Sequence, residues 1–549
     1  MTDNGVVDVL VVGAGPVGLT AAVELRRRGV GCRVVDRLPV RAPFAKAVGI
    51  QPRTLELWDR TGLVRAAVEA AVPMRGQLTY VDGVEEGRME LALPPEVPYG
   101  FAALPQYETE RILDEFLGRF GTAVERGVEL VSFTQRDDGV ISRLVSSTGT
   151  AQEEVRSQFL VGCDGAHSLV RKQLGLAFEG GAFPEEYMLA DVEVDWDLPP
   201  GYGLRAMHRA ADGTVDDLLV CIPLPGRRRY RMSMMVPPAL SRAGGHQDTD
   251  GVAHGLEEGG RLPTLPDVQA VLDRLSPQPT TASALRWSSV FRISHRLADR
   301  YGEGRVLIAG DAAHIHPPTG AQGMNTGIQD AYNLAWKLAL AVHGTAHPDL
   351  LASYGAERRP VGAEVVGRTV RHAAQGVQAD PEDPATLLLR EAQLLVGYRG
   401  SPIVAPPDGD GDGPQPGDRA PDCGGLAHDI AAYPQRLYDL LRDRDHVLLL
   451  YQDGGDRPDE LIDAARKLTS NQITVYVLLA AGAQPDPAAP PGYRDAAGEF
   501  ARAYGVRDRT AFVVRPDGYL GARLRPPTPE NLTAHLAQVF RGPPPGLAT

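Results

Sequence analysis

The sequence predicts an α/β protein of three parts: a parallel-sheet domain, a strand-rich domain inserted into it, and a separate C-terminal α/β domain. The first part is indicated by a valine-rich run at residues 6–12, which has the composition of a strand buried on both faces of a sheet. Residues 19–28 follow with the character of a helix that ends at Gly29, and residues 32–35 form a second apolar run. Strand, helix and strand in this order predict a βαβ unit.

Short apolar stretches separated by prolines and turns predict the strand-rich insert. They occupy residues 78–103 and 187–237, and the second stretch includes predicted strands at residues 218–224 and 230–236. The polar, glycine-rich residues 244–265 predict a surface loop.

A segment rich in Pro, Gly and Asp at residues 405–421 predicts a linker. Strands and helices alternate beyond it, which predicts a C-terminal domain of ordinary size. We expect strands of this domain at residues 446–451, 474–479 and 511–514.

The 549-residue chain has the composition of a globular protein and a net charge of −14. This charge argues against non-specific binding to nucleic acid or to an anionic membrane, so we expect neither as a partner. The four cysteines include no CxxC pair, which argues against a redox dithiol or a zinc ribbon, and we expect no metal site. The sparse cysteines, with no cleavable leader and no membrane-spanning apolar run, indicate a cytoplasmic protein.

A glycine-rich turn joins the first predicted strand to its helix, with the sequence Gly13-Ala14-Gly15-Pro16-Val17-Gly18. Gly13 permits the tight turn, Gly15 lets a phosphate approach the backbone, and Gly18 lets helix and strand pack closely. Asp36 closes the second strand, where a carboxylate accepts hydrogen bonds from ribose hydroxyls. Because a helix N-terminus also favours a pyrophosphate, these features predict a dinucleotide site, without separating FAD from NAD.

A further apolar strand, at residues 305–309, ends in Gly310-Asp311. Asp311 stands at the carboxyl end of this strand, where α/β folds hold ligands, and its carboxylate suits a polyol such as ribityl. The loop that follows contains Pro318 and Gly320-Ala321-Gln322-Gly323-Met324-Asn325, and it leads into a helix predicted over residues 326–342. The N-terminus of this helix is placed to stabilise negative charge on a reduced flavin ring.

A third motif, Cys163-Asp164-Gly165-Ala166-His167-Ser168 followed by Val170-Arg171, comes after another apolar run. Taken alone, it predicts a turn at the end of a strand in which Asp164 caps a short helix.

In this order and at these separations, the three motifs resemble those of the FAD-dependent aromatic hydroxylases, the single-component flavoprotein monooxygenases similar to 4-hydroxybenzoate and phenol hydroxylases. The resemblance runs from about Val6 to Arg359 and is most specific over residues 304–337. The form of residues 320–331 looks most like the branch that acts on aromatic polyketides.

The resemblance implies a FAD-binding Rossmann-like domain, an inserted strand-rich substrate-binding domain and a thioredoxin-like C-terminal domain. In the C-terminal domain, here called the tail, the resemblance rests on residues 504–506 and 513–519. Because the tail lacks CxxC, we expect a structural or dimer-contact role for it rather than dithiol exchange. The implied bounds are residues 1–75, 104–178 and 288–400 for the FAD-binding domain, 76–103 and 179–287 for the substrate domain, 401–421 for the linker and 422–549 for the tail.

The implied activity is hydroxylation of an aromatic substrate, phenolic or a polyketide quinone, with O2 through a flavin C4a-hydroperoxide after NADPH or NADH has reduced the FAD. No second GxGxxG unit is present, so NAD(P)H is expected to bind transiently. Baeyer–Villiger oxygenation of a ketone stays open, as does a non-catalytic flavin-binding protein that acts by interaction. A halogenase is disfavoured because the tryptophans form no WxWxIP signature. The chain is expected to be a monomer or a homodimer.

By the same resemblance, Gln106 stands where the family places a flavin-contacting glutamine. Asp36-Arg37 stands where the family usually has Glu-Arg, and Lys46 stands where Arg is common; Lys keeps the charge and loses the bidentate contacts. The strand-rich insert is a candidate lid over the substrate. No catalytic side chain is assigned, but four residues in or beside this lid are candidates for assisting phenol ionisation: Arg205, His208, Arg231 and His295. The residues expected to bind FAD are Gly13, Ala14, Gly15, Pro16, Val17, Gly18, Asp36, Arg37, Lys46, Gln106, Asp164, Asp311, Pro318, Gly320, Ala321, Gln322, Gly323, Met324 and Asn325.

Overall fold

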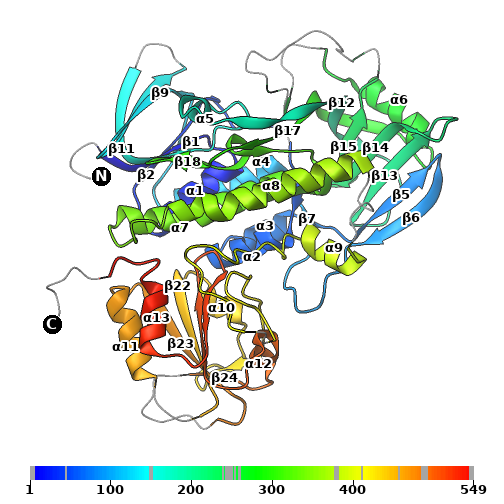
Figure 1. Ribbon diagram of the computed structural model, residues 1–549. Helices are drawn as coiled ribbons and strands as arrows, with labels where there is room; N and C mark the ends of the chain where they lie inside the picture. The colour runs from blue at the N-terminus through cyan, green and yellow to red at the C-terminus, as the bar shows by residue number, and fades with distance from the viewer. Residues whose placement is uncertain are drawn as a thin grey trace.

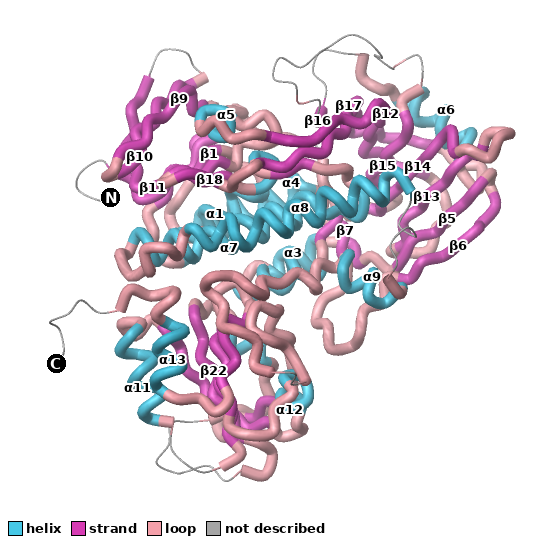
Figure 2. Tube along the Cα trace, in the orientation of Figure 1, coloured by secondary structure: helices cyan, strands magenta, loops and turns pink. Residues whose placement is uncertain are grey.

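Two long helices, α7 (Gln322–Val342) and α8 (Ala352–Gln375), cross the middle of the computed structural model (Figure 1). Two sheet layers lie on one side of these helices, and the C-terminal domain lies on the other (Figure 2). No helix in the described part of the chain is long and apolar enough to cross a bilayer. The structure describes residues 6–43, 46–147, 152–237, 240, 252, 255–256, 261–375, 382–409, 412–454, 458–483 and 492–542.

The first sheet has the strand order β18-β19-β11-β1-β2-β8, and β10 and β9 extend it from β11. Strands β11, β1, β2 and β8 run parallel, and helix α1 (Pro16–Arg27) packs between this sheet and α7. The predicted βαβ unit is therefore confirmed, although α1 begins earlier than expected because Pro16 suits the first turn of a helix. The strands are β1 (Val6–Val12), β2 (Cys32–Asp36), β8 (Val124–Arg126), β9 (Val128–Arg136), β10 (Gly139–Ser146), β11 (Gln152–Gly162), β18 (Gly302–Glu303) and β19 (Val306–Ile308).

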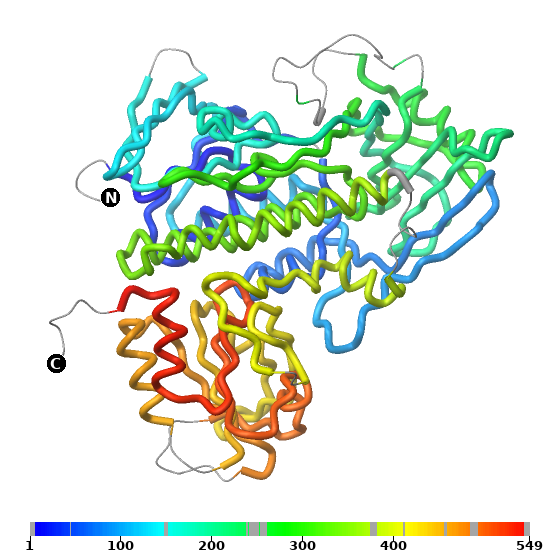
Figure 3. The backbone as a smooth tube through the Cα atoms, viewed as in Figure 1, coloured from blue at the N-terminus to red at the C-terminus, as the bar shows by residue number. Residues whose placement is uncertain are grey.

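The second sheet has the order β16-β17-β12-β15-β14-β13-β5-β6, with β20 beside β17. One face packs against helix α6 (Leu265–Leu275) through a continuous apolar cluster. Figure 3 shows the β5–β6 hairpin, drawn in blue, beside strands from much later in the chain. The strands are β5 (Gly76–Val81), β6 (Val84–Glu90), β12 (Phe178–Val194), β13 (Tyr202–Arg209), β14 (Val215–Pro223), β15 (Arg229–Met235), β16 (Gly255–Leu256), β17 (Ala282–Ala298) and β20 (His314–Ile315).

Three details differ from the elements expected from the sequence. Strand β12 begins at Phe178, beside the bound placed at residues 178/179, whereas β17 is 17 residues long and runs on through the bound placed at residues 287/288. Much of the predicted loop at residues 244–265 lies outside the described residues, but Gly255–Leu256 pairs with β17 and Leu265 already begins α6. The last part of residues 78–103, β7 (Ala102–Ala103), pairs instead with β3 (Gly49–Ile50) and β4 (Val72–Pro73) in a separate small sheet.

The C-terminal domain is a six-stranded sheet of order β21-β24-β23-β22-β25-β26 with helices on both faces. All three strands predicted for this domain are present. The predicted linker has no regular structure where it is described, yet it is packed, since the Ala405 N–H donates to the Gly521 carbonyl. The elements are β21 (Leu426–Ala427), α10 (Leu437–Leu441), β22 (His446–Gln452), α11 (Asp459–Leu468), β23 (Ile473–Leu479), β24 (Tyr493–Asp495), α12 (Glu499–Tyr504), β25 (Thr510–Val514), β26 (Leu520–Leu524) and α13 (Pro529–Leu536).

A buried ionic cluster joins the C-terminal domain to α7 and α8. The Glu357 carboxylate accepts from Lys337 Nζ at 2.7 Å and from Arg515 Nη1 at 2.6 Å, and Arg515 also binds Asp517. Burial alone would raise the pKa of Glu357, but the Arg515 guanidinium and the Lys337 ammonium hold it well below its usual range. Asp517 also accepts from the Trp336 indole N–H, so the domain is held by specific polar contacts as well as by apolar packing.

His446 lies in the same interface, with its ring centroid 5.2 Å from that of Trp336 and 4.9 Å from that of Phe540. Burial lowers the pKa of His446 to about 3, so the imidazole stays neutral in the folded protein. In the unfolded chain the His446 imidazole has a pKa of about 6.5 and binds a proton below that pH, whereas in the folded chain it does not. The free energy of unfolding therefore falls as the pH falls below about 6.5. From this residue alone we expect a loss of about 2 kcal/mol at pH 5, measured by urea unfolding at pH 7.5 and 5.0.

The matched variant is His446→Phe, which keeps an aromatic ring and removes the titrating group. Its stability should fall by about 2 kcal/mol less than that of the wild type between the two pH values. Equal losses in the two proteins would show that His446 does not titrate on unfolding.

Candidate functional site

The turn between β1 and α1 contains three glycines whose surroundings differ. Gly13 has φ +100°, and a Cβ on it would overlap the Cys163 carbonyl, while a Cβ on Gly18 would overlap the Gly13 carbonyl. Gly15 has extended backbone, and a Cβ there would meet nothing within 4 Å. Packing therefore requires Gly13 and Gly18, whereas the open space beside Gly15 fits a cofactor pyrophosphate approaching the N-terminus of α1.

Asp36 stands at the end of β2, beside this turn. Its carboxylate accepts from the Ala14 N–H at 2.7 Å and from the Leu38 N–H at 2.8 Å. A cavity of about 560 Å³ opens next to it, with Arg37 on its rim. Its walls come from the ends of β1, β2 and β11 and from the start of β9, which is the carboxyl edge where parallel sheets bind ligands. This cavity fits the ADP half of a dinucleotide.

Asp164 lines the same cavity and also caps the turn that follows β11. Its carboxylate accepts from the Ser168 hydroxyl at 2.6 Å and from the Val170 N–H at 3.1 Å, and burial raises its pKa. The capping role predicted for Asp164 is therefore present. Arg171 donates to the carbonyls of Ala312 and Ala166, which ties this third motif to the strand-end motif at Asp311.

A second cavity, of about 260 Å³, shares Gly15, Cys163 and Gly165 with the first, so the two cavities adjoin at these residues. Lys46 and Asp311 line it together, with Lys46 Nζ 3.2 Å from the Asp311 carboxylate. The other lining residues are Pro16, Val17, Ala47, Gln106, Phe291, Ala309, His316, Pro318, Ala321, Gln322, Gly323 and Met324.

The loop before α7 forms one wall of this second cavity. Gly320 has φ +68°, and a Cβ on it would overlap the Glu391 carboxylate. Ala321 also adopts a left-handed conformation, with φ +55°, and its methyl group packs against Gly49 so closely that a side chain there would collide. The loop thus places the free N–H groups of the first turn of α7 at the cavity.

Two predicted cofactor ligands in this loop use their side chains to hold it. Asn325 accepts from the Gln51 N–H and the Thr54 hydroxyl and donates to the carbonyls of Gly49 and Ala321. Its side-chain amide is fully buried and satisfied, so it supports the cavity wall.

Gln322 is held in the same way from the other side. Its Nε2 donates to the Gly320 carbonyl and to Glu391, and its Oε1 accepts from Gln393 Nε2 at 2.7 Å. Sequence reasoning missed Gln51, Glu391 and Gln393, because nothing in their own neighbourhoods indicates contact with a loop that lies far away in the chain.

His316 is a further residue that sequence reasoning missed. Burial lowers its pKa to about 4, so the ring is neutral. Nδ1 lies 2.9 Å from the Pro317 carbonyl and therefore carries the proton, which leaves Nε2 as an acceptor with no partner in the described part of the chain. A buried, unsatisfied acceptor in the cavity wall fits a ligand N–H or O–H.

The four residues named for the lid lie in different places. His208 is exposed and pairs with Asp216 at 2.6 Å, near the end of β13. His295 packs against Phe183 and is not among the residues that line the two cavities. Arg231 does reach the site, since it donates to the Lys46 carbonyl at 3.3 Å, and burial lowers its pKa to about 10. Arg205 lies further along the same sheet.

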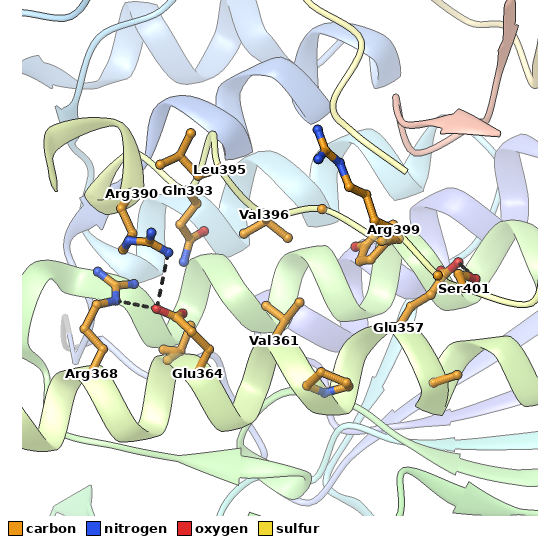
Figure 4. A pocket seen from close by; sticks show the side chains of 16 residues that line it. Glu357, Val361, Glu364, Arg368, Arg390, Gln393, Leu395, Val396, Arg399 and Ser401 are labelled. Carbon is orange, nitrogen blue, oxygen red and sulfur yellow. Dashed lines mark hydrogen bonds and ion pairs between the residues drawn. The ribbon is translucent and has the colours of Figure 1, made fainter. Parts of the chain in front are cut away.

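A third cavity, of about 320 Å³, lies between α8 and the segment after helix α9 (Pro384–Glu391) (Figure 4). Glu364 points toward both Arg368 and Arg390 in its wall, and both arginines are ion-paired with it. None of the residues predicted to bind FAD lines this cavity. One residue of its wall, Gln393, contacts the loop before α7 by donating a hydrogen bond from its Nε2 to Gln322 Oε1.

The fold and the two adjoining cavities define an α/β protein with a dinucleotide-binding site. A family described as FAD binding domain matches residues 6–369. A flavin-dependent monooxygenase of Mycobacteroides abscessus is 34% identical over 524 residues, which cover 93% of this chain and 96% of the relative. An anhydrotetracycline monooxygenase of Streptomyces rimosus is 34% identical over 554 residues, which cover 98% of this chain and 99% of the relative.

The solved structure of aklavinone-11 hydroxylase with FAD and aklavinone matches with a TM-score of 0.75 at 25% identity. The match covers 97% of this chain and 98% of that one. The chain therefore belongs to the flavin-dependent monooxygenases of the FAD-binding-domain family.

Proposed function

We propose that this protein is an NAD(P)H-consuming monooxygenase that hydroxylates an aromatic substrate, phenolic or a polyketide quinone. The observation that carries the proposal is the pair of adjoining cavities that extends from the open space at Gly15 to the N-terminus of α7. When bound, FAD supplies the redox chemistry, taking hydride from NAD(P)H and activating O2.

The chain's own residues bind and orient the cofactor in this proposal. The turn at Gly13–Gly18 and the N-terminus of α1 hold the pyrophosphate, and Asp36 accepts from the ribose hydroxyls. Lys46, Gln106 and Asp311 line the path toward the flavin ring. The first turn of α7, held by Asn325 and Gln322, stabilises negative charge on the reduced ring.

The substrate side of these cavities is the second sheet, which reaches the second cavity through Phe291. Two relatives act on or bind fused-ring compounds, as their names anhydrotetracycline monooxygenase and aklavinone-11 hydroxylase state. This supports a multi-ring aromatic substrate for the present chain.

We propose a structural role for the C-terminal domain. Cys423 is the single cysteine in it, and burial raises the pKa of its thiol, so no dithiol exchange is available. The buried contacts of Arg515 with Glu357 support a role in holding α7 and α8 in place.

Anaerobic reduction of the purified holoprotein tests the proposed activity. NADPH or NADH should bleach the flavin absorbance slowly alone and at least tenfold faster with a suitable aromatic, tested with anhydrotetracycline, aklavinone and pentachlorophenol. A flavin that neither nucleotide bleaches, with or without any of these aromatics, would contradict the proposal.

A further inference from the structure

The second sheet has an inner face that points away from α6. Alternation along β13, β14 and β15 puts Leu204, Leu219 and Met234 in the apolar cluster with α6. The residues between them point to the opposite, inner face. Ile222 on this face packs with Val48, and Arg229 donates to the Tyr107 hydroxyl, so the inner face is turned toward the FAD-binding part of the chain.

A row of directly paired residues crosses this inner face. Arg205 of β13 is opposite Val220, which is opposite Ser233, which is opposite Leu189 of β12. Leu189 lies next to β17, where Phe291 lines the flavin-side cavity. Val220 and Ser233 are only half-buried, so this part of the face is open to a ligand.

Arg205 differs from Arg229 and Arg231 of this face because its side chain forms no hydrogen bond or ion pair with the described residues. Arg229 binds the Asp191 carboxylate with both oxygens within 3.0 Å, and Arg231 is buried and donates to backbone carbonyls. The described residues supply no hydrogen-bond acceptor for Arg205, and its Nε is buried without a partner. Burial lowers the pKa of Arg205 and no nearby carboxylate offsets this. A half-buried guanidinium without a counter-charge is costly, which indicates that a ligand supplies one.

The position of Arg205 also limits the length of such a ligand. Four strand-to-strand steps separate β13 from β17 in the order β17-β12-β15-β14-β13, which is roughly 19 Å along the sheet. The arginine side chain covers part of this distance. A single ring held at Phe291 cannot also reach Arg205, whereas several fused rings can.

We propose that the Arg205 guanidinium binds an ionised oxygen, an enolate, phenolate or carboxylate, at the end of a multi-ring aromatic substrate that is remote from the flavin. This assignment rests on the proposed function and adds to it the charge and the minimum length of the substrate. The remote contact orients the ring system along the inner face and so selects which carbon faces the flavin.

Equilibrium titration of the holoprotein, followed by flavin absorbance, tests the assignment with two acidic probes. Anhydrotetracycline is long and carries ionisable enol oxygens, and pentachlorophenol is a single ring that is already ionised at neutral pH. Arg205→Gln should weaken anhydrotetracycline binding ten- to a hundredfold and leave pentachlorophenol binding within twofold of the wild type. Arg205→Lys, which keeps the charge, should restore most of the lost affinity.

Arg209→Gln is the matched control, because Arg209 lies on the same strand, is exposed and, among the described residues, forms a side-chain ion pair with Glu86. It should bind both probes like the wild type. The assignment is overturned if Arg205→Gln binds anhydrotetracycline as the wild type does, if it loses both probes equally, or if anhydrotetracycline does not bind the wild type. If binding depends on Arg205 but no probe accelerates flavin reduction, the proposed function fails and the assignment of Arg205 stands.

Discussion

Replacing Gly15 with valine should abolish FAD binding while leaving the fold intact. The backbone at Gly15 is extended, a conformation that valine adopts readily, and a Cβ there meets no protein atom within 4 Å. The added methyl groups instead occupy the space beside the N-terminus of α1, where the pyrophosphate approaches the backbone. We expect at least a hundredfold loss of FAD affinity, measured by reconstitution of the apoprotein and flavin fluorescence.

Two other glycine substitutions isolate this effect. Gly87→Val, at a half-buried position on β6 where a Cβ likewise meets nothing within 4 Å, should leave both folding and FAD binding unchanged. Gly13→Ala should lower the stability of the apoprotein itself, because φ +100° is strained for alanine and its Cβ overlaps the Cys163 carbonyl. If Gly15→Val keeps wild-type affinity for FAD, the pyrophosphate does not lie at this turn.

Arg515→Met should destabilise the protein by about 3–5 kcal/mol, because it leaves the Glu357 and Asp517 carboxylates buried with one cation fewer. Methionine fills much of the arginine volume, so the loss comes from the unpaired charge rather than from a cavity. Urea unfolding of the holoprotein measures the change, and the transition of the C-terminal domain should shift most.

The control for this variant is Arg399→Met, which breaks an exposed ion pair with Asp418, where the Arg399 side chain is 61% exposed. That change should cost less than about 1 kcal/mol. A similar small cost for Arg515→Met would mean that the buried cluster does not hold the C-terminal domain to α7 and α8.

Features that depend on local sequence were predictable. Val6–Val12, the Gly13–Gly18 turn and Asp36 form a continuous segment, and each residue's role follows from its place in a βαβ unit. Helix α7 was also predicted, because its apolar spacing is strongly periodic.

Features that depend on contacts between distant segments could not be predicted from the sequence. The side chains of Asn325 and Gln322 look like cofactor ligands in the sequence, but Gln51 and Gln393, each far along the chain, turn them into supports of the loop. The long strand β17 carries no turn signal at residues 287/288, so its continuation there could be seen only once it was paired with β12. The missing counter-charge of Arg205 is likewise a property of the assembled sheet.

The most direct test of the account is the source of the oxygen atom in the product. The holoprotein, NADPH and anhydrotetracycline or another multi-ring phenol are incubated under 18-oxygen gas, and the product is analysed by mass spectrometry. We expect a hydroxylated aromatic that carries a single labelled oxygen atom, with consumption of one NADPH per product. An unlabelled product, or NADPH oxidation that yields only hydrogen peroxide with every aromatic tested, would contradict a monooxygenase function.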